Sequence, residues 1–344
     1  ILTNISYKNY AQRISDTRLL HIINYLPDTL EYAVTNPSGD LIANETIFTS
    51  GVQSEYSGDT LVDNIQLNDM NWLIVSGNTS GVYGNIIDVE GNPVGGQYLI
   101  SETSNRSAYP LLYKFSDGSI LVLLCEYTEN TTLQFLSIDN HYLSGVILNP
   151  NGTVKVPRFN ITDTLIIDAA STDLNKTILP VIWISADNTM SGRTIDSQGN
   201  MSEPQLLTTT NSLVFTGFLG IPETSDVVIA WESSLSPNGS FFGVYDMVIN
   251  SETLEVVRPE VQIEPILLGV NHASKLMILP NNNWLYTWHS SAGESANWTI
   301  KGLILDSDQN VVVPDFVINN PESIPQLYLF DPERDVMIYQ DRYI

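Results

Sequence analysis

The stretch WLIVSGNTSGVYGNIIDVEGNPVGGQYLIS, residues 72–101, decides how the rest of the chain is interpreted. Its apolar run, Trp72–Val75, crosses a polar turn, Gly77–Ser80, into a second alternating segment, Val82–Val89. The tripeptide Glu90-Gly91-Asn92 then reverses the chain into Pro93–Ser101. Short runs of β-forming residues separated by Gly and Asn turns are typical of antiparallel strands. The stretch therefore predicts consecutive strands of one sheet.

The opening strand of this stretch recurs along the chain. Seven segments align without gaps: LLHIINY (19–25), WLIVSGN (72–78), LVLLCEY (121–127), LPVIWIS (179–185), VVIAWES (227–233), WLYTWHS (284–290) and DVMIYQD (335–341). Their fifth position is mostly large and apolar, and it holds Ile23, Ser76, Cys125, Trp183, Trp231, Trp288 and Tyr339. The middle positions are apolar on both faces, which predicts strands covered on both sides. The aligned tryptophans are accordingly expected in the core.

Six hairpin turns led by Asn or Asp follow these strands. They are NPSG (36–39), DVEG (88–91), NPNG (149–152), DSQG (196–199), NSET (250–253) and DSDQ (306–309), so successive turns start 47 to 61 residues apart. Asn or Asp in first place accepts backbone hydrogen bonds across the turn, and Gly provides the position with positive φ. A period near fifty residues with several strands in each unit is typical of a β-propeller.

The predicted fold class is therefore all-β, a β-propeller with seven blades of antiparallel strands. Each blade runs from an inner strand through a second and a third strand to an outer one. The length of 344 residues suits one closed array, so we expect a single domain, 1–344. Its repeats are approximately 18–50, 63–101, 109–160, 163–209, 212–263, 272–319 and 326–344, after an N-terminal closing or exchange segment, 1–17.

The last repeat contains only two predicted strands and no hairpin turn after residue 335. A propeller closes best when both chain ends share one blade, because this arrangement removes free sheet edges. We expect the N-terminal strand to complete the last blade, either in its own molecule or in a neighbouring chain. Addition to a neighbour would build a polymer. This assembly strand consists of Ile1, Leu2, Thr3, Asn4, Ile5, Ser6 and Tyr7.

The charge of the chain disfavours several classes of partner. The net charge is −25, from 14 basic and 39 acidic residues, and the basic residues form no cluster. Binding to phosphate backbones therefore lacks its electrostatic contribution, and we expect no nucleic-acid partner. No apolar stretch is long enough to span a membrane. The expected partners are the chain itself or other extracellular proteins, with carbohydrate as a further option.

Eleven Asn-x-Ser/Thr sequons indicate an N-glycosylated protein that is extracellular or on the cell surface. The acceptors are Asn4, Asn44, Asn78, Asn105, Asn130, Asn151, Asn160, Asn175, Asn200, Asn238 and Asn297. A chain rich in Asn, Ser and Thr also produces such triplets by chance, so their placement matters. Five of them lie in predicted turns, from which a glycan projects without disturbing a sheet: Asn78, Asn130, Asn151, Asn200 and Asn238.

The few residues with metal-binding or nucleophilic chemistry form no recognisable pattern. The one cysteine, Cys125, excludes intrachain disulfides and is expected to be a buried packing thiol. The four histidines match no metal-binding spacing, and His21 and His289 are expected to be ordinary sheet residues. No G-x-S-x-G elbow marks a serine nucleophile.

Acidic residues offer two further hypotheses. Five acids lie at or near second strands and could supply the paired carboxylates of a glycoside hydrolase: Asp117, Glu126, Asp187, Glu232 and Asp335. We expect most of them to be solvated turn residues instead. The segment Asp306–Asn310 begins like a calcium loop. However, Val311 and Val317 stand where that loop requires Gly and Glu. We therefore expect a hairpin turn there and no cofactor besides N-linked glycans, with calcium as the minor alternative.

The unit GVYGNIIDVEGNPVGGQYLIS (81–101), with VVIAWESS (227–234) and WLYTWHSS (284–291) before its equivalents, resembles a degenerate repeat of propeller-like extracellular and surface proteins. The resemblance covers nearly the whole chain, implies a surface or matrix location, and carries no catalytic residues across. The leading hypothesis is a secreted structural glycoprotein, a subunit of an extracellular fibre, coat or matrix. The alternatives are a carbohydrate- or protein-binding module, and a glycoside hydrolase or lyase with carboxylates in its channel.

Overall fold

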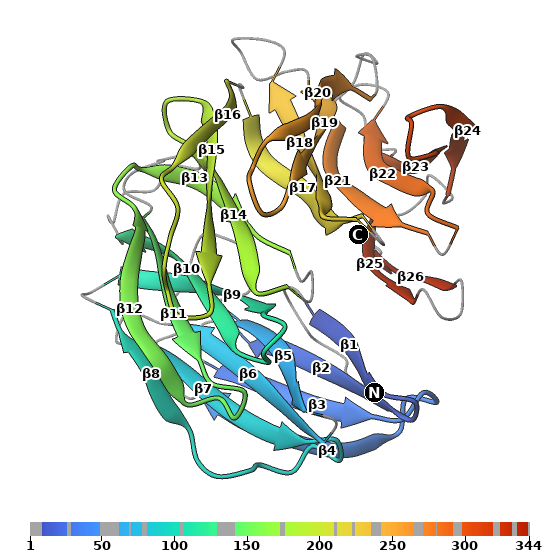
Figure 1. Ribbon diagram of the computed structural model, residues 1–344. Helices are drawn as coiled ribbons and strands as arrows, with labels where there is room; N and C mark the ends of the chain where they lie inside the picture. Colours follow the sequence, from blue (N-terminus) through green and yellow to red (C-terminus); the bar gives the residue numbers. More distant parts are fainter. Residues whose placement is uncertain are drawn as a thin grey trace. The chain divides into compact units, whose positions relative to one another are not determined.

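The computed structural model describes residues 9–25, 29–48, 62–68, 70–77, 81–103, 106–128, 142–172, 176–209, 212–221, 224–234, 242–263, 271–279, 281–291, 298–318, 324–331 and 336–342. This part of the chain forms 26 strands and no helix (Figure 1). It therefore contains no helix suited to crossing a membrane. The strands pair in seven antiparallel sheets, six of four strands and one of two. The prediction of an all-β chain is confirmed.

We number the sheets 1 to 7 in chain order, since each uses consecutive strands. Sheet 1 contains β1 (Asn9–Ser15), β2 (Arg18–Tyr25), β3 (Thr29–Thr35) and β4 (Leu41–Phe48). Sheet 2 contains β5 (Val62–Asn68), β6 (Asn71–Gly77), β7 (Gly81–Asp88) and β8 (Tyr98–Glu102). Sheet 3 contains β9 (Arg106–Lys114), β10 (Ile120–Thr128), β11 (Tyr142–Leu148) and β12 (Val154–Thr162).

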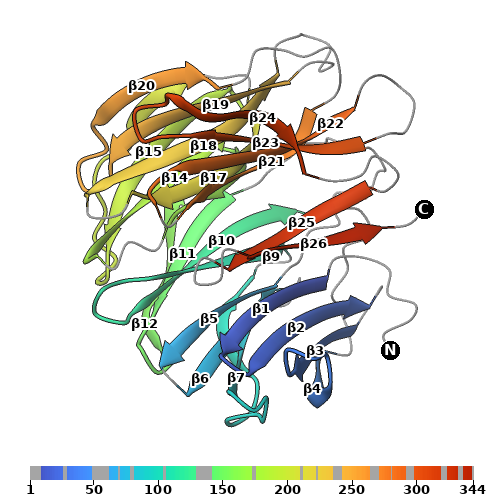
Figure 2. The same cartoon turned by 90° about the vertical axis from the view of Figure 1, so that its right-hand side faces the viewer.

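Sheet 4 contains β13 (Ile166–Ala170), β14 (Ile178–Ser185), β15 (Thr189–Asp196) and β16 (Gln205–Thr209). Sheet 5 contains β17 (Ser212–Gly220), β18 (Asp226–Ser234), β19 (Phe242–Asn250) and β20 (Val256–Gln262). Sheet 6 contains β21 (Asn271–Ile278), β22 (Trp284–Ser291), β23 (Trp298–Leu305) and β24 (Val311–Val317). Sheet 7 contains β25 (Ile324–Asp331) and β26 (Val336–Arg342), which lie side by side in Figure 2. All seven aligned segments fall on the second strand of a sheet, as predicted.

The contacts of the chain group into two compact units. The first comprises Ile1–Ile166, Asn175–Thr177 and Asp196–Asn200, and the second comprises Ile167–Leu174, Ile178–Ile195 and Met201–Ile344. The first unit holds sheets 1 to 3, and the second holds most of sheet 4 and sheets 5 to 7. The expectation of a single domain, 1–344, stays a prediction.

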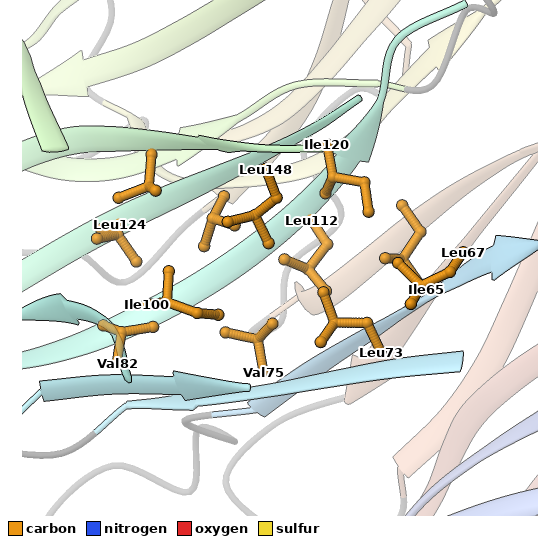
Figure 3. Close-up of a cluster of buried hydrophobic side chains, with 12 residues drawn as sticks. Ile65, Leu67, Leu73, Val75, Val82, Ile100, Leu112, Ile120, Leu124 and Leu148 are labelled. Atoms are coloured by element: carbon orange, nitrogen blue, oxygen red, sulfur yellow. The ribbon is translucent and has the colours of Figure 1, made fainter. Parts of the chain in front are cut away.

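Strand β6 explains why the second strands are apolar on both faces. Trp72 and Ile74 pack with residues of sheet 1, whereas Leu73 and Val75 pack with residues of sheet 3. Figure 3 shows the latter cluster, in which side chains from the two sheets point toward one another. Each aliphatic side chain that is fully buried in this way stabilises the fold by about 1.5–3 kcal/mol relative to an exposed one.

Strand β18 repeats this arrangement in the second unit. Trp231 packs with residues of sheet 4, and Val228 and Ala230 pack with residues of sheet 6. The aligned tryptophans Trp183, Trp231 and Trp288 are at most 2% exposed. Their expected place in the core is confirmed.

The hairpin turns obey the predicted rule, with one exception. Their fourth residue has positive φ at Gly39 (87°), Gly91 (85°), Gly152 (86°), Gly199 (83°) and Gln309 (64°). The fifth turn was predicted as Asn250–Thr253, but it is one residue longer. Leu254 takes positive φ there (60°), and its amide donates to Asn250 O at 2.8 Å.

The N-terminal boundary of the first repeat was predicted wrongly. Residues 1–17 were assigned to a closing segment, yet Asn9–Ser15 forms β1 and pairs with β2 as the inner strand of sheet 1. The error has a physical cause, since the sequence NYAQRIS has no apolar run, although Ile14 is buried. The predicted assembly strand, Ile1–Tyr7, lies outside the described residues.

Candidate functional site

His21, Cys125 and His289 all lie on second strands, namely β2, β10 and β22. His21 of β2 is half-buried, and its Nε2 lies 2.8 Å from Thr35 Oγ1 of β3. Burial lowers the pKa of His21 below its usual value. It is the hydrogen-bonded sheet residue that we expected. Cys125 is only partly buried, contrary to prediction, because its position in β10 is less covered than the aligned tryptophans.

Asp117 and Asp187 lie in turns, as predicted, and each is engaged there. Asp187 accepts the Thr189 hydroxyl at 2.7 Å. Asp117 Oδ2 accepts the Ser197 hydroxyl at 2.7 Å, and Lys155 Nζ lies 3.2 Å away. Burial acts to raise the pKa of Asp117, but the hydrogen bonds from Ser197, Ser119 and Lys155 outweigh it and hold this pKa at about 2. Asp117 is therefore not placed as a proton donor at neutral pH.

Glu126 is buried instead of solvated, and it forms a closed polar cluster within sheet 3. Its side chain in β10 is fully covered. Its Oε1 accepts the Ser144 hydroxyl of β11 at 2.5 Å, and Arg158 Nη2 of β12 lies 2.6 Å from the same oxygen. Arg158 also donates to Glu102 O at 3.1 Å. The carboxylate is thus neutralised by a cation of its own sheet, which is a structural arrangement. The Glu232 side chain and Asp335 lie outside the described residues.

A second buried acid, Asp246 of β19, joins sheets 5 and 6. Its carboxylate is fully covered and accepts hydrogen bonds from Tyr286 of β22 and from Gln309 in the turn after β23. Arg258 Nη2 of β20 lies 3.3 Å from it, and the guanidinium stacks on the Trp284 ring at 4.7 Å from its centroid. Burial raises the pKa of Asp246, while Tyr286, Arg258 and Gln309 oppose this rise.

Sequence reasoning missed Asp246, although a signal for it exists. Four residues before the Asn or Asp of each turn, sheets 2, 3, 4 and 6 carry a glycine: Gly84, Gly145, Gly192 and Gly302. Sheet 5 has Asp246 at this place and sheet 1 has Tyr32. In sheets 2, 3 and 6 an outer-strand aromatic ring covers the glycine. The aspartate therefore replaces a packing position of the repeat with a buried ion pair.

Asp306 acts as the turn residue that we expected. Its Oδ1 accepts the amides of Asp308 and Asn310, and its Oδ2 accepts Asn310 Nδ2 at 3.0 Å. The same bonds link Asp88 to Asn92 and Asp196 to Asn200. Within the described ranges, no three His, Cys, Asp or Glu side chains gather to hold a metal ion. The calcium alternative stays untested.

Four of the predicted glycosylation acceptors fall on described residues, and all four are exposed. Asn44 lies on β4 and Asn160 on β12, both outer strands, while Asn151 and Asn200 lie in hairpin turns that lead into outer strands. The predicted turn location of Asn151 and Asn200 is therefore confirmed. The remaining acceptors lie outside the described residues: Asn4, Asn78, Asn105, Asn130, Asn175, Asn238 and Asn297.

The outer strands β20 and β24 expose valines and contain no sequon. The exposed fractions are 38% for Val256, 54% for Val257, 37% for Val261, 60% for Val311, 49% for Val312, 37% for Val313 and 60% for Val317. Arg258 of β20 donates to Ser307 O, in the turn that leads into β24, at 3.1 Å. This hydrogen bond links β20 to the turn that precedes β24. We call these seven residues the valine surface.

Comparisons with known proteins identify the fold and nothing finer. No family model matches the sequence, and no curated protein shows significant sequence similarity to it. A solved polysaccharide lyase of family PL25, an ulvan lyase, has a TM-score of 0.60 at 9% identity over 94% of this chain and 86% of that chain. The structure of BBS1N in complex with ARL6DN, soaked with mercury, has a TM-score of 0.54 at 10% identity over 98% and 89%.

These two likenesses, at identities far below 25%, show the fold alone. The seven consecutive antiparallel sheets and the similarity to propeller-like structures confirm the predicted β-propeller. The extracellular type that the sequence resemblance implied is not tested by them.

Proposed function

We propose that this protein is a secreted, N-glycosylated scaffold of the cell surface or extracellular matrix, which assembles through the valine surface of β20 and β24. The valine surface is the observation that carries this proposal. Apolar side chains that gather on the surface of a soluble protein often mark a site where a partner binds. One charge of β24 is paired, because Lys301 Nζ lies 3.5 Å from Asp315.

The placement of the acceptor asparagines also distinguishes the valine surface from other outer strands. Outer strands β4 and β12 each present an exposed acceptor, and two more lie in outer turns. A glycan on any of these strands would cover its edge and keep it from association. Strands β20 and β24 have no acceptor and remain open to contact.

Prolines determine how a partner contacts this surface. Pro259 and Pro314 stand within β20 and β24, next to shifts in the pairing register with β19 and β23. A proline and a bulge on an edge strand both hinder the addition of a further strand. The partner is therefore held by side-chain packing against the valines, and not by a continued sheet.

The alternatives are a carbohydrate-binding module and a glycoside hydrolase or lyase, and the likeness to a solved polysaccharide lyase supports the second of them at the level of the fold. The fold of the ulvan lyase is shared, but Glu126 and Asp246 of this chain are each paired with an arginine of the same sheet. No observation on the described residues favours a sugar-cleaving pair of acids over an assembly surface.

The test begins with protein secreted from a glycosylating host. Mass spectrometry before and after enzymatic glycan removal counts the occupied sites, and light scattering across a concentration series measures association. We expect several occupied sites and concentration-dependent association. The double variant Val311→Lys with Val317→Lys should weaken association, because it places charge on the valine surface. Leu206→Lys is the matched control, since Leu206 is 61% exposed on β16 of another sheet. A protein without glycans, or one that stays monomeric throughout, contradicts the proposal.

A further inference from the structure

Each hairpin turn of sheets 2 to 4 packs on the preceding sheet. A Cβ built on Gly91, in the turn of sheet 2, would lie 2.7 Å from Val34 Cγ2 and 2.8 Å from Ala43 Cβ of sheet 1. Val34 and Ala43 are paired across β3 and β4. The Tyr32 hydroxyl donates to Gly91 O at 2.8 Å. The absence of a side chain at Gly91 therefore allows the turn to lie directly on an aliphatic pair, which we call a socket.

The turns of sheets 3 and 4 are seated in the same way. A Cβ on Gly152 would lie 2.8 Å from Tyr98 Oη and 3.3 Å from Ile86 Cδ1, both of sheet 2, and the Tyr98 hydroxyl donates to Gly152 O at 2.8 Å. A Cβ on Gly199 would lie 3.2 Å from Val156 Cγ1 and 3.8 Å from Ile147 Cδ1, the socket of sheet 3. This contact therefore recurs at three successive junctions.

Sheet 6 contains a socket built like that of sheet 3. The sequences NPNGTVKVPRFNI (149–161) and DSDQNVVVPDFVI (306–318) share the pattern Val-x-Val-Pro-x-Phe-x-Ile after the turn. Ile304 pairs with Val313 as Ile147 pairs with Val156. Phe316 covers Gly302 as Phe159 covers Gly145. The pair Ile304–Val313 is therefore the socket of sheet 6.

The socket of sheet 6 is more exposed than its counterpart. Ile147 is 0% exposed and Val156 is half-buried beneath Gly199. In sheet 6, Ile304 is only half-buried and Val313 is 37% exposed. Since the local sequence and pairing are the same, the difference lies in what covers the two sockets.

The described part of sheet 7 contains no hairpin that could seat on this socket. In sheets 2 to 4 the seated turn joins the third strand to the outer strand, whereas the described strands of sheet 7 are β25 and β26 alone.

One turn of the chain is free to fill such a socket. The turn Asn36–Gly39 has the same backbone as the seated ones, with φ of 87° at Gly39 and a hydrogen bond from Gly39 N to Asn36 O of 2.9 Å. Gly91 and Gly152 are buried, but Gly39 is exposed. No described atom lies within 4 Å of a Cβ built on Gly39. Among the described residues, this turn has no socket and the socket of sheet 6 has no turn.

We infer that the turn Asn36–Gly39 of one molecule seats on the socket Ile304–Val313 of a second copy of this chain. This inference rests on the proposed assembly function and gives it a geometry. The two surfaces differ, so the contact is head-to-tail, and repetition of it produces rings or filaments. Every molecule in such an assembly uses the turn of sheet 1 and the socket of sheet 6 once.

The experiment uses one variant for each side of the contact. Gly39→Asn keeps the turn, because Asn tolerates positive φ, but its Cβ would collide with the socket. Gly95→Asn is the control, since Gly95 has φ of 90° and equally open surroundings. Val313→Lys places a charge in the socket, and Val154→Lys, at 39% exposure on β12, is its control.

Light scattering of the glycosylated full chain should show association of the wild type and of both controls. Gly39→Asn and Val313→Lys should each weaken it by roughly tenfold or more, because each blocks the centre of a small interface. Mixed one to one, the two variants should form dimers and nothing larger. Gly39→Asn still has an intact socket and Val313→Lys still has an intact turn, so only one contact between the two can form.

The outcomes separate this inference from the function on which it rests. Wild-type association that both variants retain, or a mixture that stays monomeric, overturns the head-to-tail contact and leaves the scaffold proposal standing. A wild type that is monomeric at all concentrations overturns both.

Discussion

At the scale of single residues, Asp246 is the clearest departure from the repeat. It carries a fully buried carboxylate where four sheets carry glycine, and its cation is Arg258, at the place that Val313 holds in sheet 6. Removal of one partner of a buried ion pair leaves the other charge uncompensated. Replacement of both by apolar groups often restores stability.

We predict that Arg258→Val lowers the free energy of unfolding by about 3–5 kcal/mol, because Asp246 then stays buried without a cation. The double variant Asp246→Gly with Arg258→Val introduces the residue types that sheet 6 has at these two places, Gly302 and Val313. It should recover part of this loss. Urea unfolding of the two single variants and the double variant forms a double-mutant cycle. The exposed pair Lys301–Asp315 is the control, and Lys301→Met should cost at most about 1 kcal/mol. Additive losses at Asp246 and Arg258 would contradict the expectation.

Asp117 predicts how stability depends on pH. Its pKa in the folded chain is about 2, below the ordinary value of 3.8. The unfolded chain therefore binds a proton more readily, and the stabilisation from Asp117 is present above about pH 4 and is lost as the pH falls toward 2. The variant Asp117→Asn should melt at a lower temperature than the wild type at pH 6. The two melting temperatures should converge near pH 2. A constant difference across this range would refute the assignment.

At the scale of elements, the fifth turn allows two opposing effects to be compared. Leu254 adopts positive φ, which costs a residue other than glycine about 1–2 kcal/mol. Its side chain is nevertheless 2% exposed, within the cluster shared by sheets 4 and 5. Loss of a buried leucine side chain costs about 2–5 kcal/mol, which exceeds the strain relieved.

The variant Leu254→Gly should therefore be less stable than the wild type by about 1–4 kcal/mol, measured by chemical unfolding. Asn188→Gly provides the matched control. Asn188 has φ of 65° in the exposed turn between β14 and β15, so its replacement relieves strain and removes no buried side chain. Its stability should equal or exceed that of the wild type. A Leu254→Gly variant as stable as the wild type would contradict this, because the strain relieved would then fully offset the burial lost.

The elements also show what the sequence predicts and where it stops. Periodicity located all seven second strands, because each must be apolar on two faces, and turn chemistry located the hairpins. β1 was missed because NYAQRIS has no apolar run. Asp246 was missed because only an alignment of the third strands shows the glycine that it replaces. The sockets were not predictable from one repeat at a time, since each needs a turn from the next sheet.

At the scale of the whole molecule, the described part of sheet 7 has two strands where every other sheet has four. The predicted partner of its outer strand β26 is the segment Ile1–Tyr7. A chain without residues 1–7 should therefore differ from the full chain in one of two ways. If the strand completes sheet 7 of its own molecule, the shortened chain melts at a lower temperature at every protein concentration. If the strand completes a neighbour, the melting temperature of the dilute protein is unchanged and association is weakened.

Calorimetry and light scattering on the same samples distinguish these two arrangements. The deletion also removes the acceptor Asn4, so Asn4→Gln in the full chain is the necessary control: it loses that glycan and keeps the strand. The deletion can be combined with Gly39→Asn, because the two act on different contacts. If both contacts join neighbouring molecules, each change alone leaves a reduced association that the combination abolishes. A shortened chain that melts and associates like the full one means that Ile1–Tyr7 closes no sheet, and sheet 7 must then be completed from elsewhere.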